Sequence, residues 1–234
     1  MNQDRTTAKR IGATDYGRTF DFNRFMKDLK AAFASYHNVP IVTLIAQKET
    51  PYQVLIGTIL SARTKDETTA EACSRLFKKA PTVRKLAGLS EQELAKLIYP
   101  VGFYKTKAKH LKAAAAMLLT EFEGRIPDTL EDLLKIPGVG RKTANLVLGE
   151  AFNKHAICVD THVHRISNRL GIIQTNTPKE TEQTLEQILP KRHWIRYNTY
   201  LVAHGQMVCK PISPLCSQCQ IHSFCQRVNV TRSR

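Results

Sequence analysis

The amino-acid sequence predicts an all-α protein, and three observations support that fold class. Apolar residues recur at helical spacing in many segments, the first of which contains Phe22, Phe25, Met26, Leu29 and Phe33. Several segments begin with a residue that caps helices and carry an acidic residue three positions later. No segment has a convincing strand pattern, and no unit of 20 to 50 residues repeats. We therefore expect about ten helices. They are residues 22–36, 52–62 and 64–79, a short helix that begins at residue 90, and residues 105–123, 129–134, 141–152, 162–170, 177–189 and 196–208.

Local signals mark where the helices of the first half begin. Pro51 opens a helix whose apolar residues lie on nearly every face, which predicts that this helix is buried at the centre of a domain. Thr64 with Glu67 forms a predicted capping box for the next helix. Ser90 with Glu93 forms another.

The helices of the second half have similarly clear limits. The helix of residues 105–123 ends at Gly124 and is basic near its start, at Lys105, Lys107, Lys109 and Lys112. Thr177 is a predicted N-cap, because a first-turn proline and then Glu180 follow it.

Charge and composition restrict the class of partner. The 234 residues carry a formal net charge of +15, and the isoelectric point is near 9.7, which favours a polyanionic partner. No run approaches the 18 apolar residues of a membrane span, so nucleic acid fits better than membrane. Residues 1–20 are polar and basic and are expected to form a flexible arm rather than a signal peptide. We therefore expect an intracellular, cytoplasmic protein, in which the six cysteines are thiols or metal ligands rather than disulfides.

A glycine hairpin that leads into a helix is the first candidate site. Residues 134–145 contain Gly138, Val139 and Gly140 in a tight turn, and Arg141 follows at the start of the next helix. Outward-pointing amides and the helix dipole together can bind a phosphate oxygen. Taken alone, the motif is also compatible with an ordinary connection between two helices, which is what most Gly-x-Gly turns are.

Two residues near this hairpin have the chemistry of a covalent catalyst. Lys142 lies in the first turn of a helix, where the helix dipole and desolvation would disfavour its charge and activate the amine as a nucleophile. Asp160 lies 18 residues later at another predicted helix start, where a carboxylate stays ionised and can stabilise a positive centre. An N-cap role alone would also explain Asp160.

Four cysteines near the C-terminus form a predicted metal site. Their spacing is C-x6-C-x2-C-x5-C, at Cys209, Cys216, Cys219 and Cys225. Four thiolates suit tetrahedral zinc and an iron-sulfur centre equally well, and a disulfide pair is a weaker alternative.

These motifs together resemble those of the endonuclease III family of DNA glycosylases, whose hairpin is a helix-hairpin-helix. The resemblance covers about residues 22–226 and also includes residues 159–162, which read Val-Asp-Thr-His. It implies that Lys142 is the nucleophile, that Asp160 is its partner and that His162 is the histidine of the motif. It also implies that the four cysteines hold a 4Fe-4S cluster, with zinc as the alternative. Arg63 and Phe103 would then fill the gap that a flipped base leaves, and Lys210 is the one basic candidate for phosphate binding in the cluster loop.

The resemblance also implies an architecture and a reaction. A six-helix lobe would span residues 44–154, with the helix-hairpin-helix at about 129–152, and the second lobe would span 155–234. The N-terminal arm and helix, residues 1–43, would pack with the second lobe. A bifunctional enzyme of this kind would release oxidised pyrimidines from double-stranded DNA as a monomer and cut abasic sites by β-elimination through a Schiff base.

Two alternatives remain. An adenine or other mismatch glycosylase of the same superfamily would carry a glutamate in the helix before residue 61, and residues 54–62 contain none. A helix-hairpin-helix DNA-binding module with structural zinc would share the charge and the cysteines but would form no covalent adduct with DNA.

Overall fold

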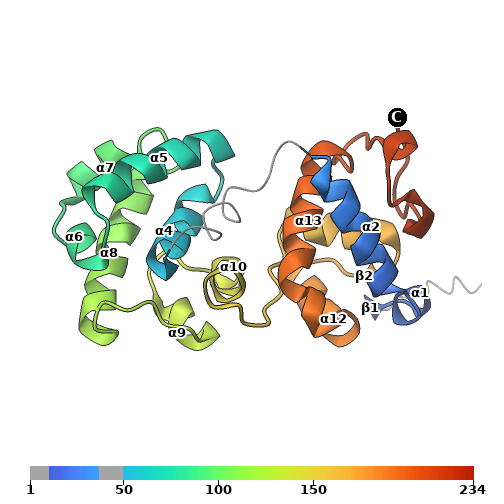
Figure 1. Cartoon of the computed structure of the whole chain (residues 1–234), viewed down its shortest axis with the longest axis horizontal. Helices are drawn as coiled ribbons and strands as arrows, with labels where there is room; N and C mark the ends of the chain where they lie inside the picture. The colour runs from blue at the N-terminus through green and yellow to red at the C-terminus, as the bar shows by residue number, and fades with distance from the viewer. Residues whose placement is uncertain (1–10, 37–49) are drawn as a thin grey trace, which may run out of the picture. The chain divides into compact units, whose positions relative to one another are not determined.

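The computed structural model describes residues 11–36 and 50–234 (Figure 1). Within these residues helices dominate, so the predicted all-α class is confirmed. The chain divides into two compact units. Unit 1 comprises Met1–Asn38 and Val159–Arg234, and unit 2 comprises Val39–Cys158. No helix among residues 11–36 and 50–234 is long and apolar enough to cross a membrane.

Unit 2 is a bundle of helices around α4. Its helices are α4 (Pro51–Ser61), α5 (Asp66–Lys79), α6 (Val83–Ala87), α7 (Glu91–Ile98), α8 (Tyr104–Glu121), α9 (Leu130–Lys135) and α10 (Arg141–Phe152). Leu55, Ile56 and Leu60 of α4 are fully buried, and α4 packs against α5, α8 and α10. The prediction of a central apolar helix is therefore confirmed.

Unit 1 packs the N-terminal helix onto the C-terminal segment. Its elements are β1 (Gly12–Ala13), α1 (Asp15–Arg18), α2 (Phe22–Ala34), α11 (Thr161–Leu170), β2 (Ile173–Gln174), α12 (Pro178–Ile188), α13 (Trp194–Met207) and three short 3-10 helices, η1 (Lys191–His193), η2 (Cys216–Gln218) and η3 (His222–Phe224). α2 lies along α13 (Figure 1). Phe25 of α2 contacts the rings of Tyr197 and Phe224, which joins three distant parts of the sequence in one apolar core.

The expectation of a flexible arm is wrong for residues 11–20. Gly12 and Ala13 pair antiparallel with Gln174 and Ile173, and Thr14 caps α1. The two strands are too short for an alternating pattern to be visible in the sequence, which is why the sequence predicted no strand. Lys9 and Arg10 lie outside the described residues.

The predicted caps are confirmed at two helices and wrong at one. Ser90 and Glu93 form the capping box of α7, and Thr177 caps α12. Thr64 does not cap α5, whose N-cap residue is Lys65, one position later than predicted, and no side chain caps this helix. The Thr64 hydroxyl instead accepts a hydrogen bond from the Gly102 amide, which is 3.2 Å away.

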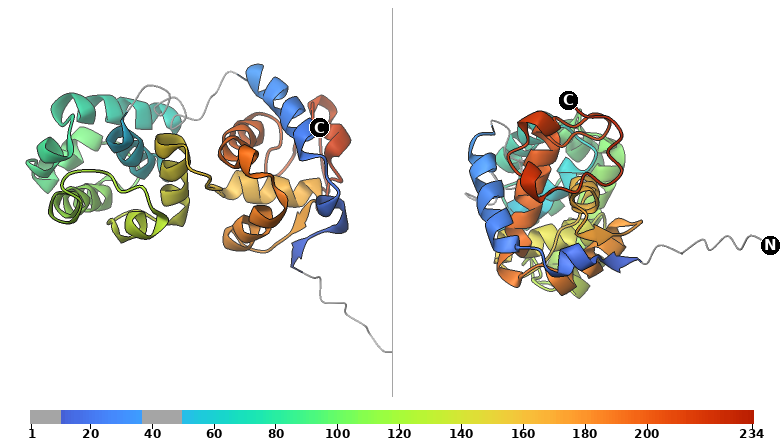
Figure 2. Two further views of the ribbon diagram at one scale, coloured as in Figure 1. Left: turned by 60° about the horizontal axis from the view of Figure 1, so that its bottom comes forward. Right: turned by 90° about the vertical axis from the view of Figure 1, so that its right-hand side faces the viewer.

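The C-terminal segment is ordered and packs against the cysteine loop. The Arg234 amide donates to the Pro214 carbonyl over 2.8 Å, and the Arg234 carbonyl accepts from the Ser217 amide over 3.0 Å. Val228 donates to the carbonyl of Arg169 in α11. Figure 2 shows this segment, in red, as loops and short turns. Residues 227–234 are therefore part of the fold around the cysteine loop.

Candidate active site

The glycine hairpin closes as a tight turn between α9 and α10, and its two glycines differ in role. Gly138 has φ +84°, and a Cβ there would lie 3.0 Å from the ring-bearing side chain of His110, so this position requires glycine. Gly140 has an ordinary extended conformation, and nothing lies within 4 Å of where its Cβ would be. The Val139 side chain is buried, and its amide donates to the Ile136 carbonyl over 3.0 Å. The turn therefore leaves space beside the backbone of Gly140, at the start of α10.

Lys142 is exposed in the first turn of α10. Gly140 is the N-cap residue, and no side chain caps this helix, so its first turn retains donors and a partial positive charge. The sequence position of Lys142 predicts desolvation of the amine. Because Lys142 is exposed, that desolvation is not supplied by unit 2 itself.

Buried groups fix the backbone beneath Lys142. The buried Cys158 thiol lies 3.6 Å from the Lys142 carbonyl, and the side chain of Asn145 donates to the Ile157 carbonyl over 3.0 Å. These contacts tie α10 to the segment that leads into α11.

Asp160 is the N-cap of α11, as its position before a helix predicted. Its Oδ1 accepts from the amides of His162 and Val163, each at 2.9 Å. Among the described residues no group donates to Oδ2, so one carboxylate oxygen caps the helix while the other can meet a ligand. Capping and catalysis are therefore compatible in this side chain.

His162 packs inside unit 1. Its Nδ1 lies 3.2 Å from the Arg165 guanidinium, and a Cβ on Gly205 of α13 would come within 2.2 Å of the same nitrogen. Gly205 thus makes room for this ring, which lies where α11 meets α13.

Arg63 and Phe103 lie together on unit 2. Both are exposed, both have left-handed backbone conformations with φ near +54° and +58°, and the Arg63 guanidinium lies 5.6 Å from the centroid of the Phe103 ring. The structure therefore brings these two predicted residues into contact.

Two of the four lysines near the start of α8 point inward. The Lys112 ammonium donates to the carbonyls of Ala87 and Leu89, and the Lys107 ammonium donates to carbonyls at and just beyond the C-terminal end of α4. Lys107 is only 7% exposed, and this burial lowers the pKa of its amine to about 8. Two of the four lysines are therefore not available to a basic surface, because charge counting along a helix does not distinguish its inward face.

The lowered pKa of Lys107 predicts a pH dependence of stability. Between about pH 8 and 10.5 the unfolded chain holds this proton and the folded chain does not, so the free energy of unfolding should rise with pH in that window. Urea unfolding of wild type and Lys107→Met at pH 7.5 and 9.5 should show the wild type gaining stability relative to the variant. If the free energies of unfolding of wild type and Lys107→Met differed by the same amount at both pH values, the lowered pKa of Lys107 would be contradicted.

The four predicted metal ligands line one small cavity in unit 1. Cys209, Cys216, Cys219 and Cys225 surround about 30 Å³ together with apolar side chains, His204, His222, Arg169 and Arg227. Burial, with neighbouring thiols adding to it, raises the pKa of Cys219 to about 11 and also raises the pKa of Cys225. Cys73 and Cys158 are buried elsewhere, as expected of small apolar residues.

Two arginines of α11 bind the loop after Cys209. Arg165 donates to the Cys209 carbonyl over 2.8 Å, and Arg169 donates to the carbonyls of Lys210 and Pro211 and to Cys209 Sγ, 3.4 Å away. The helix that Asp160 caps therefore also supports the cysteine loop. Sequence reasoning missed both arginines, because nothing in their spacing indicates a loop 40 residues away. Lys210 itself is exposed.

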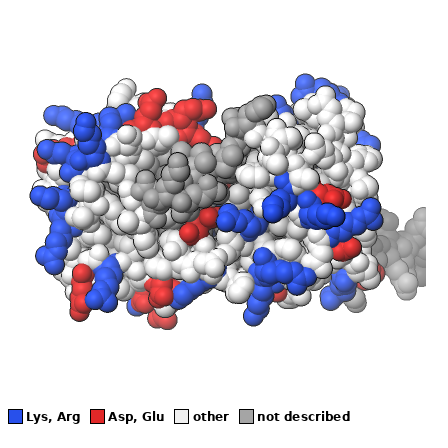
Figure 3. Space-filling model, in the orientation of Figure 1, with Lys and Arg blue, Asp and Glu red and all other residues white. Residues whose placement is uncertain are grey.

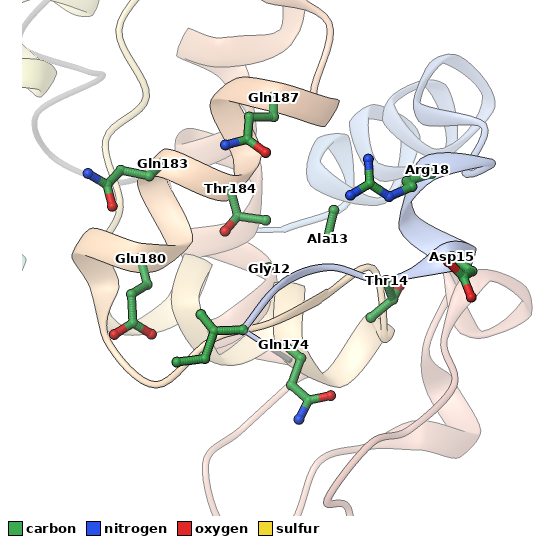
Figure 4. Close-up of a pocket in the computed structure, with 11 residues that line it drawn as sticks. Gly12, Ala13, Thr14, Asp15, Arg18, Gln174, Glu180, Gln183, Thr184 and Gln187 are labelled. Atoms are coloured by element: carbon green, nitrogen blue, oxygen red, sulfur yellow. The ribbon is translucent and has the colours of Figure 1, made fainter. Parts of the chain in front are cut away.

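A second cavity in unit 1 lies away from these residues. It encloses about 680 Å³ between β1, α1, β2 and α12. Figure 4 shows Gln183, Thr184 and Gln187 on one side and Arg18 and Asp15 on the other. None of the predicted site residues lines it. Lys and Arg side chains are spread over both units on the face in Figure 3, with Asp and Glu among them.

Comparison with known proteins gives consistent matches. The family model described as HhH-GPD superfamily base excision DNA repair protein matches residues 56–191. Endonuclease III of Thermotoga maritima is 48% identical over 180 residues, which are 76% of this chain and 84% of that protein. The chloroplastic endonuclease III homolog 2 of Arabidopsis thaliana is 45% identical, and the match covers 78% of this chain but 50% of that longer protein.

A solved structure matches over most of the chain as well. It is a trapped covalent intermediate of endonuclease III with DNA, described as an estranged-adenine complex. It has a TM-score of 0.78 and 33% identity, and the match covers 88% of this chain and 94% of that one. The family model and the Thermotoga relative each match more than half of this sequence. The chain therefore belongs to the endonuclease III family of the HhH-GPD superfamily and is a DNA glycosylase and apurinic/apyrimidinic lyase of base excision repair.

Proposed function

We propose that this glycosylase and lyase uses Lys142 as its nucleophile and Asp160 as the carboxylate partner, and that its preferred substrates are oxidised pyrimidines in duplex DNA. The observation that carries the proposal is the position of each residue at a helix start. Lys142 lies in the uncapped first turn of α10, and Asp160 caps α11 through one oxygen only. A covalent intermediate with DNA, as named for the endonuclease III structure above, requires such a nucleophile on the protein.

The reaction begins at the sugar carbon C1′. The neutral Lys142 amine attacks C1′ as the bond to the damaged base breaks, and the base leaves with the bonding electrons and takes up a proton. The Asp160 carboxylate stabilises the positive charge that develops on the sugar and accepts a proton from the attacking nitrogen. The sugar ring then opens to give a Schiff base between Nζ and C1′.

Strand cleavage follows from that Schiff base. Removal of a proton from C2′ allows the 3′-phosphate to leave, which is a β-elimination. Water then hydrolyses the Schiff base and restores the Lys142 amine. Because Lys142 is exposed on unit 2, we expect the extruded nucleotide to contribute to the desolvation that favours the neutral amine.

The DNA-binding role of the hairpin belongs to its backbone. Gly138 and Gly140 are exposed and Arg141 follows them, so this turn can approach a phosphate closely. Val139 supports the turn from inside, since its side chain is buried and its amide is used in the turn. Arg63 and Phe103 are the proposed wedge that replaces the extruded nucleotide, and His162 and Lys210 are further proposed contacts.

We propose a 4Fe-4S cluster as the group held by Cys209, Cys216, Cys219 and Cys225. The four cysteine thiols line one cavity, and four cysteine thiolates are the usual ligands of a 4Fe-4S cluster. Membership of the endonuclease III family, whose proteins generally contain such a cluster, favours it over a single zinc ion. When bound, the cluster would cross-link the loop that Arg165 and Arg169 attach to α11.

The cluster proposal has a direct chemical test. Protein purified without oxygen should be brown and should contain about four iron and four sulfide per chain. Cys219→Ser should lose the broad visible absorbance, whereas Cys73→Ser should keep it, because Cys73 is buried in α5 of unit 2. A colourless protein with one zinc per chain would contradict the assignment.

Substrate choice is tested by a panel of duplexes, each with one modified base or one abasic site. We expect release of oxidised pyrimidines, followed by strands that end in the unsaturated aldehyde of β-elimination. Release of undamaged adenine from mismatches, without strand cleavage, would instead favour a mismatch glycosylase. We also propose that the chain acts as a monomer inside the cell on its DNA, which size-exclusion chromatography of the free protein would test.

A further inference from the structure

Lys107 joins two turns of unit 2 that carry exposed side chains. Its ammonium donates to the carbonyls of Leu60, 2.8 Å away, and Ala62, 2.6 Å away. It also lies 3.2 Å from the Thr64 hydroxyl. These acceptors lie at and just beyond the C-terminal end of α4, where helix carbonyls lack partners and a positive charge is favoured. All three hydrogens of the ammonium therefore have acceptors in one segment, residues 60–64.

The second turn packs directly on the first. The Gly102 amide donates to the Thr64 hydroxyl over 3.2 Å, so the hydroxyl receives hydrogen bonds from both Lys107 and Gly102. A Cβ on Gly102 would lie 2.5 Å from the Arg63 carbonyl oxygen, which means that only glycine permits this approach. The turns of residues 61–64 and 101–103 are therefore held in contact through one hydroxyl and one ammonium.

This junction supports the two strained residues that face solvent. Arg63 and Phe103 each adopt a left-handed conformation that non-glycine residues rarely adopt. Phe103 is 63% exposed, and its ring lies against the Arg63 guanidinium. Such backbone conformations persist where surrounding contacts fix them, and the contacts of Lys107 and Thr64 adjoin both residues.

We propose that Lys107 is a positioning residue that, with the Thr64 hydroxyl, fastens the two turns so that Arg63 and Phe103 enter the duplex as one preformed element. The inference rests on the proposed wedge role of these two side chains. A preformed wedge would spare the enzyme the cost of ordering two loops at the moment of base extrusion. Lys107 would thus act on extrusion through the loops and would not touch the reacting atoms.

The matched variants are Thr64→Val and Thr64→Ser. Valine keeps the shape of threonine but removes the hydroxyl that links Gly102 to Lys107, whereas serine keeps the hydroxyl. Lys107→Met is a more severe variant because it leaves buried carbonyls without donors, so thermal unfolding is measured for all three variants. If Lys107→Met is too unstable to assay, Thr64→Val and Thr64→Ser still test the proposal.

Two readouts separate extrusion from chemistry. The first is the single-turnover cleavage rate on a duplex with one oxidised pyrimidine, divided by the rate on a single-stranded abasic oligonucleotide that needs no extrusion. Thr64→Val should lower this ratio about tenfold, while Thr64→Ser should stay within about twofold of wild type. The second is the fluorescence of 2-aminopurine placed opposite an abasic site, which should rise less on binding to Thr64→Val.

The outcomes distinguish this inference from the proposed function. An equal fall on both substrates, or a ratio and fluorescence change unaltered in Thr64→Val, would overturn the positioning role. The fluorescence readout requires no bond cleavage. A wild type that unstacks 2-aminopurine more than Thr64→Val does, but cleaves no oxidised pyrimidine, would therefore overturn the proposed substrate while supporting the positioning role.

Discussion

Lys142→Ala is expected to abolish the adduct that borohydride traps between the protein and abasic DNA. The amine is the proposed bonding atom, so no Schiff base can form without it. Lys142 is exposed in the first turn of α10, and alanine favours helices, so the fold should be unaffected. Affinity for abasic duplex should fall by about tenfold at most, since one of several positive charges is lost. Gel analysis of trapped adducts and an anisotropy titration on the same duplex measure the two effects.

The neighbouring residue supplies the matched control. Arg141→Ala removes a positive charge from the same helical turn but leaves the nucleophile in place. It should bind DNA more weakly, with a salt dependence reduced by about one phosphate contact, and still give full trapping at saturating protein. Wild-type trapping in Lys142→Ala, or a variant that no longer folds, would contradict the assigned role of Lys142.

Asp160→Asn should slow base release by about a hundredfold or more, while leaving the protein as stable as wild type. Asparagine caps helices as well as aspartate does, so the bonds to the His162 and Val163 amides can be kept. The substitution removes the charge that stabilises the developing sugar cation. Single-turnover kinetics on a lesion-containing duplex, together with urea unfolding, measure both effects.

Asp160→Ala separates the two roles of this carboxylate. It removes the cap as well as the charge. We therefore expect slow base release, as in Asp160→Asn, and also a free energy of unfolding that is lower by about 1 kcal/mol. If Asp160→Asn were as active as wild type and Asp160→Ala were only less stable, then Asp160 would be a cap and nothing more.

Local signals predicted helices well because their causes are local. The limits of α10 agree with the predicted residues 141–152, and the caps at Ser90, Thr177 and Asp160 are as expected. Each of these depends on a side chain and an amide two or three residues away. The hairpin was recognisable for the same reason, because Gly138 requires a backbone conformation that the sequence already indicates.

The errors arose where a partner distant in sequence determines a residue's role. Thr64 has the spacing of a capping box, but its hydroxyl meets Gly102, 38 residues away. Lys107 is one of four lysines near the start of α8, and its sequence position does not show that its ammonium contacts the end of α4. Residues 12–13 read as a loose arm because their partner strand lies about 160 positions further along. Such contacts cannot be seen in a single sequence.

The most direct measurement is the site of covalent attachment. Wild-type protein is incubated with abasic duplex and borohydride, digested, and the peptide that carries the sugar adduct is identified by mass spectrometry. We expect attachment at Nζ of Lys142. Attachment at any other amine, with Lys142 unmodified, would contradict its role as the nucleophile.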